Sequence, residues 1–155
     1  MKKQDLLMTA KQIQPPSLPS TQEFTEKKVA MASDVIRILR KRPDIEKLLV
    51  SDNLDMMDDN VRNMSRFMES VFCQYNPEVL VETCLWVFRA YRNHGFQLTF
   101  WPAHLDIWIE VLKASLSDTS LSEIMPFYQW IQVNIPTFVT MTDTSMSEIP
   151  SLRVK

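Results

Sequence analysis

Apolar residues recur at intervals of three or four along most of the chain, with polar residues between them. These intervals place side chains on one face of an α-helix, because the helix completes a turn every 3.6 residues. The longest such stripe consists of Leu54, Met57, Val61, Met64, Met68, Phe72 and Tyr75. Shorter stripes occur in residues 24–38, 81–88, 105–112 and 124–138. The pattern predicts an all-α protein whose helices each bury one face.

Start and stop signals define two helices before the long stripe. The first is predicted to begin at Ser20 or Thr21, since Ser20 and Glu23 have the spacing of a capping box. It ends before Pro43, which lacks a backbone donor and breaks the apolar pattern. Proline is also favoured at the first position of a helix, so a short second helix is expected from Pro43 to Val50.

Four more helices are predicted in the rest of the chain. The third helix carries the long stripe and ends near Asn76. Asn76 is a suitable cap and Pro77 a suitable first residue for the fourth helix, which stops at His94–Gly95. The fifth helix spans residues 102–115. The sixth spans residues 120–138, opens on a second Ser-x-x-Glu sequence, and is expected to bend at a proline near its end.

The composition changes at both ends of residues 20–141, which we expect to form a single domain. Residues 1–19 are expected to form a flexible arm that ends in three prolines. The alternative is an arm that docks on this protein or on a partner through Leu6, Leu7 and Ile13. Residues 142–155 return to the composition of a tail and are expected to be flexible.

Composition and charge exclude several classes of function. Of the 155 residues, 45% are hydrophobic and 23% charged, as in an ordinary soluble domain, and a net charge of −2 offers no basic surface to nucleic acid. The single glycine, Gly95, cannot build a phosphate-binding loop. The sequence has no run of about 18 apolar residues that would span a bilayer. Both cysteines lie in apolar helical patterns, which indicates a reduced, cytoplasmic compartment.

Candidate chemistry is concentrated in residues 87–108, which hold both histidines, His94 and His104. Catalysis by a triad or a carboxylate pair needs an activated nucleophile or an assembled acid and base, and the sequence indicates neither, so no enzyme is expected. The histidines are separated by a helix break and lack HExxH or CxxC partners, so no metal site is expected. A haem globin that uses His94 as its iron ligand is kept as an alternative.

The same segment can supply the polar end of a binding site for an otherwise apolar ligand. Arg89, Arg92, His94 and His104 are the candidates to hold a carboxylate, because cations and the free N–H groups of a helix start favour anions. Methionine-rich helix faces adapt to an aliphatic chain. The apolar residues predicted to line a tunnel are Met64, Met68, Phe72, Leu85, Phe88, Trp108, Leu112, Tyr128 and Ile131.

Two segments of the chain, YRNHGFQLTFWPAHLDIWIEVL (residues 91–112) and EIMPFYQWIQVNIPTFV (residues 123–139), carry a family resemblance. They resemble the non-haem globin sensor domains of bacterial stress and sporulation signalling. In particular, the chain is similar to the small plasmid-encoded sporulation-inhibitory proteins related to the sensor domain of a sporulation histidine kinase. The resemblance covers residues 20–141 and rests on helix order, length and these two segments, which specify no ligand residues.

The resemblance implies a globin-like fold of about six helices without haem. It further implies a hydrophobic tunnel that holds a fatty acid, a nearby site for a halide such as chloride, and a homodimer formed by the last helices. The implied function is inhibition of sporulation signalling, either by sequestering the signal from a sensor histidine kinase or by competing with that kinase. The alternative is a ligand-free helical adaptor protein, whose own side chains fill its core.

Overall fold

The computed structural model describes residues 3–49, 54–93 and 98–142, and within these ranges the chain forms eight α-helices and no β-strand. The all-α prediction is confirmed. Two more helices are present than the sequence predicted, one near the N-terminus and one near the C-terminus. The helices are α1 (Lys3–Lys11), α2 (Leu18–Arg40), α3 (Ile45–Leu48), α4 (Leu54–Cys73), α5 (Pro77–Asn93), α6 (Phe100–Ser115), α7 (Asp118–Val133) and α8 (Ile135–Met141).

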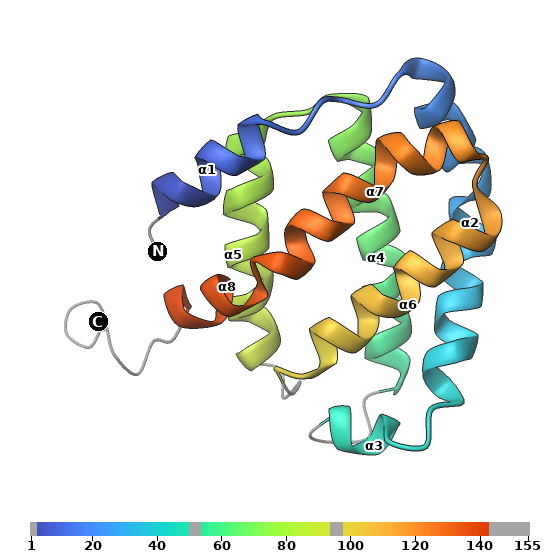
Figure 1. The fold of residues 1–155 in the computed structure, drawn as a ribbon. Coiled ribbons are helices and arrows are strands. Elements are labelled where there is room, and N and C mark those ends of the chain that lie inside the picture. The colour runs from blue at the N-terminus through green and yellow to red at the C-terminus, as the bar shows by residue number, and fades with distance from the viewer. Residues whose placement is uncertain (1–2, 50–53, 94–97, 143–155) are drawn as a thin grey trace.

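The helices form two groups that meet at the centre of the molecule (Figure 1). In the first group, α2 packs against α4, α6 and α7, and in the second α5 packs against α1 and α8. Phe24, Phe72 and Phe127 connect α2, α4 and α7 in the core, with ring centroids 4.9 Å apart for the first pair and 5.1 Å for the second. Their edge-to-face geometry is one that aromatic pairs favour.

Helix boundaries agree with the predicted signals at some positions and differ at others. The Oδ1 atom of Asn76 accepts hydrogen bonds from the backbone N–H groups of Glu78 (3.0 Å) and Val79 (3.3 Å), which confirms the predicted cap of α5. By contrast, α6 begins at Phe100, two residues before the predicted start at Pro102. Proline within the first turn is compatible with this earlier start, since the N–H groups there have no partner inside the helix.

The predicted bend near the end of the sixth helix is a division between α7 and α8. Pro136 lies in the first turn of α8, where its missing N–H and its ring interrupt the preceding helix. Asn134 stands between the two helices, and its side-chain amide donates to the Trp130 carbonyl oxygen at 2.8 Å. This bond satisfies one of the carbonyl groups exposed where α7 ends.

The first nineteen residues, which were expected to be a flexible arm, include α1. Leu6 and Ala10 lie on one face of α1 and are fully buried where the helix packs on α5. The Tyr75 hydroxyl donates to the Ala10 carbonyl oxygen at 2.5 Å, and the Trp130 indole N–H donates to Thr9 Oγ1 at 2.9 Å. These contacts connect the N-terminal segment to the rest of the molecule.

The N-terminus of α7 is capped by a residue of α2. Ser117 is the N-cap residue of α7, and its hydroxyl oxygen accepts from the backbone N–H of Ser120 at 3.4 Å. The Glu23 carboxylate of α2 accepts from the Ser117 N–H (2.8 Å), the Ser117 hydroxyl (2.7 Å) and the Ser120 hydroxyl (2.6 Å). A carboxylate at a helix N-terminus compensates the unpaired N–H groups and the positive end of the helix dipole.

The N-terminus of α2 has the reverse arrangement. Ser17 is its N-cap residue, and the Ser17 backbone N–H donates to Glu123 Oε1 of α7 at 2.7 Å. The predicted capping boxes within each helix are therefore wrong, because both glutamates bind across to the other helix. We call this arrangement the reciprocal cap; it consists of Ser17, Ser20, Glu23, Ser117, Ser120 and Glu123.

Candidate ligand-binding cleft

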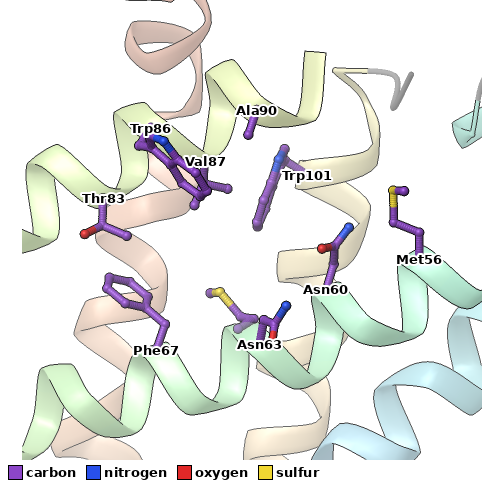
Figure 2. A pocket seen from close by; sticks show the side chains of 10 residues that line it. Met56, Asn60, Asn63, Phe67, Thr83, Trp86, Val87, Ala90 and Trp101 are labelled. Carbon is purple, nitrogen blue, oxygen red and sulfur yellow. The ribbon is translucent and has the colours of Figure 1, made fainter. Parts of the chain in front are cut away.

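A cleft of about 480 Å³ lies between α4 and α5, and the Trp101 indole of α6 reaches into it (Figure 2). Seven of its ten lining residues are apolar, and the other three are neutral amides or a hydroxyl. None of the ten is ionisable, so the interior of the cleft suits an uncharged, mainly apolar group. The lining residues are Met56, Asn60, Asn63, Met64, Phe67, Thr83, Trp86, Val87, Ala90 and Trp101.

The cleft exists because α4 and α5 direct their main apolar faces toward different neighbours. On α4, Met57, Val61 and Met68 are fully buried and belong to the predicted stripe, which is the side of α4 that packs into the core with α2. Four of the five α4 residues that line the cleft form a second stripe next to the first, at positions 56, 60, 63 and 67, and the fifth, Met64, belongs to the predicted stripe. Figure 2 shows this second stripe facing Thr83, Trp86, Val87 and Ala90 of α5.

The inner end of the cleft reaches the aromatic core. Trp101 is stacked on Phe88, with ring centroids 5.2 Å apart and an interplanar angle of 27°. A small pocket of about 20 Å³ adjoins the cleft at Trp101. It shares four lining residues with the cleft and extends to Cys84, Phe88 and Ile131. Burial raises the pKa of the Cys84 thiol to about 12, so this cysteine stays protonated and is a poor nucleophile.

The outer rim of the cleft combines exposed apolar side chains with polar groups. Trp86 is 65% exposed and Met56 is 37% exposed. On the α4 side, an Arg66 Nη2–H group donates to Asn63 Oδ1 at 2.7 Å. A large exposed aromatic side chain beside an apolar cleft is typical of a binding surface.

The four residues predicted to hold a carboxylate are not brought together by the described part of the chain. Arg89 lies on α5 with its side chain exposed, and it does not line the cleft. His104 is fully buried in α6 and likewise does not line the cleft. His94 and the side chain of Arg92 lie outside the described residues.

His104 is held as a neutral imidazole within an aromatic cluster. Its ring centroid lies 5.1 Å from that of Phe100 and 5.2 Å from that of Trp101, and burial lowers its pKa to about 3. The Trp108 indole N–H donates to His104 Nε2 at 3.1 Å. An indole nitrogen can only donate, so Nε2 must be the accepting nitrogen and Nδ1 carries the proton.

The Nδ1–H group of His104 and the hydroxyl of Tyr128 have no hydrogen-bond partner among the described residues, and both side chains are fully buried. The Tyr128 ring lies 5.8 Å from the Trp108 indole that contacts His104. Buried polar groups usually pair with protein, water or an ion.

The nine residues predicted to line a tunnel are all buried. Met64 lines the cleft, and Met64, Phe88 and Ile131 line the smaller pocket below it. The other six pack elsewhere in the core, outside both of these cavities: Met68, Phe72, Leu85, Trp108, Leu112 and Tyr128.

The structure offers little for metal chemistry in the part of the chain that it describes. In residues 3–49, 54–93 and 98–142, no three His, Cys, Asp or Glu side chains are grouped so that they could hold a metal ion. Across the same residues, none of the helices combines the length and apolar character that crossing a membrane requires.

No family model, curated protein or solved structure matches the chain.

Proposed function

We propose that the chain is a cytoplasmic, non-catalytic sensor-type domain that binds a fatty acid in the cleft between α4 and α5. The observation that carries this proposal is the cleft itself, which is about 480 Å³ in volume and has seven apolar residues among its ten lining residues. Ligand sites of this size are generally apolar and contain a few polar groups that fix orientation. The exposed Trp86 and the buried Trp101 provide aromatic surface along the path of an acyl chain.

The sensor assignment comes from the family resemblance, and the helical architecture is compatible with it. In this proposal α2 to α8 form a globin-like domain without haem. The domain acts as a homodimer and inhibits sporulation signalling, either by sequestering the fatty acid from a sensor histidine kinase or by competing with that kinase. The cleft supports the sequestering route, because a domain that removes a lipid signal must contain a site for it.

Substituting Ala90 by Trp will block the cleft and reduce fatty acid affinity at least about tenfold, the loss expected when a bulky ring displaces part of an acyl chain. Ala90 lies in the α5 wall, so the new indole will project into the space that the ligand needs. Native mass spectrometry and titration calorimetry of delipidated protein with hexadecanoic acid will measure the loss.

Val79→Trp is the matched control for this experiment, because Val79 is exposed on the same helix and does not line the cleft. It should bind as the wild type does. If the folded wild-type protein binds no fatty acid, the proposal is wrong, and the chain is better described as a ligand-free helical adaptor. If Ala90→Trp binds as well as Val79→Trp, the ligand lies in a different part of the molecule.

A halide ion is the second ligand in this proposal, and the two buried donors of His104 and Tyr128 support it. A halide accepts hydrogen bonds from neutral N–H and O–H groups and would satisfy donors that are otherwise costly to bury. We expect the wild type to melt at a higher temperature in sodium chloride than in sodium gluconate of equal ionic strength. Tyr128→Phe should lose most of this difference, and an unchanged difference would place the ion elsewhere.

A further inference from the structure

We infer that the ligand of this cleft enters tail first and keeps an anionic head group at the outer rim, beside the Asn63 amide and close to the Arg66 guanidinium bound to it. The inference rests on the proposed function, since it names the chemistry and the orientation of the ligand in the same cleft. It assigns recognition to two residues of α4, outside the segment that the sequence pointed to. The ligand class is a single-chain amphiphile with a carboxylate.

The hydrogen bond between Arg66 and Asn63 fixes which way the amide points. A guanidinium can only donate, so the Asn63 atom that lies 2.7 Å from Arg66 Nη2 must be the carbonyl oxygen Oδ1. The Asn63 NH₂ group is therefore left with two donor hydrogens, and Asn63 lines the cleft. Arg66 also polarises this amide, which strengthens it as a donor to an anion.

The charges near this part of α4 leave Arg66 as a local cation. Asp59 pairs with Arg62 at 3.4 Å, and Glu69 pairs with Lys28 at 3.5 Å. Within the described part of the chain, Arg66 has no carboxylate within ion-pair distance, and its side-chain bond is to the neutral Asn63. A carboxylate beside Asn63 would thus meet a positive charge that no acid neutralises, with two amide donors next to it.

The inner part of the cleft excludes the opposite orientation. Its floor consists of Met64, Val87 and Trp101, with Phe88 stacked behind the indole. A carboxylate placed there would lose its hydration without gaining a cation, at a large free-energy cost. At the rim, Asn63 and Arg66 are both exposed, so the head group can stay partly hydrated while the tail is buried.

The test compares hexadecanoic acid with its uncharged methyl ester, using the delipidated full chain and titration calorimetry. We expect the wild type to prefer the acid by about tenfold, the size of one hydrogen bond to a charged group. Arg66→Gln and Asn63→Ala should each weaken acid binding about tenfold and remove most of the preference, while ester binding stays the same. Added salt should weaken acid binding to the wild type more than to Arg66→Gln.

Two neighbouring residues of α4 provide controls. Arg62→Gln removes a cation of the same helix that is already paired with Asp59. Asn60→Ala removes the other cleft amide, to which no arginine of the described residues donates. Both should keep the preference for the acid. Equal affinities of the wild type for acid and ester, or an unchanged preference in Arg66→Gln, would overturn the inference and leave the cleft as the binding site. Failure of the wild type to bind either compound would instead contradict the proposed function.

Discussion

Lowering the pH from 7.5 to 5 will reduce the free energy of unfolding by about 2 kcal/mol through His104. Burial lowers the pKa of this histidine from its ordinary value of 6.5 to about 3 in the folded protein. Below pH 6.5 the His104 imidazole becomes protonated in the unfolded chain but stays neutral in the folded protein. The stability that the neutral imidazole provides is therefore complete above pH 6.5 and is lost at about 1.4 kcal/mol per pH unit as the pH falls toward 3.

Urea denaturation at several pH values between 7.5 and 5, in chloride-free buffer, will measure this effect. Chloride is left out because a halide bound at Nδ1 would favour the protonated ring. His104→Gln keeps an uncharged side chain with an acceptor for Trp108, and its stability should change little over this range. His94→Gln removes the only other histidine and separates its contribution to the pH dependence from that of His104. If His104→Gln remains as sensitive to pH as the wild type, some other group is responsible.

Much of the fold could be predicted because its signals are local. The stripe through Met57, Val61 and Met68 specified a buried helix face, and the Asn76 cap specified where α5 begins. The reciprocal cap could not be predicted in the same way. Ser20 and Glu23 have the spacing of a local capping box, but the partner that Glu23 selects depends on how α2 packs against α7. Local sequence patterns do not predict tertiary contacts of this kind.

The candidate cleft was missed for a related reason. Sequence patterns identify the face of a helix that is most apolar, and the cleft uses the second face of α4, where Asn60 and Asn63 interrupt the apolar residues. A usable signal was present at Trp86, a large aromatic residue on the polar side of its predicted helix. The segment around His94 and His104 suggested a binding site because it contains rare residue types, yet in the structure the His104 ring packs against the aromatic rings of α6.

Substituting Glu23 by Ala will lower the free energy of unfolding at pH 7 by about 2 kcal/mol, at the upper end of what removing a helix cap costs. The carboxylate accepts three hydrogen bonds from Ser117 and Ser120 at the N-terminus of α7. It also accepts one from Lys27 at 2.8 Å, and because the lysine side chain is 43% exposed, solvent screens part of this contact. Without Glu23, the Ser117 and Ser120 donors at the N-terminus of α7 must form hydrogen bonds with water instead. Glu26→Ala, an exposed glutamate one turn along α2, is the matched control and should change stability by less than about 0.5 kcal/mol.

The effect of Glu23 will also depend on pH, in a range below that of His104. The hydrogen bonds from Lys27, Ser120 and Ser117 lower the pKa of Glu23 from its ordinary value of 4.5 to about 2. The folded state thus favours the ionised carboxylate, and the stability it provides is complete above pH 4.5 and lost as the pH falls toward 2. The difference in unfolding free energy between the wild type and Glu23→Ala should shrink over this range, whereas a difference that stays constant would mean that the carboxylate acts through packing and not through its charge.

Glu23 and Glu123 cap each other's helices. The loss of unfolding free energy in the double variant Glu23→Ala/Glu123→Ala should therefore be smaller than the sum of the losses in the two single variants.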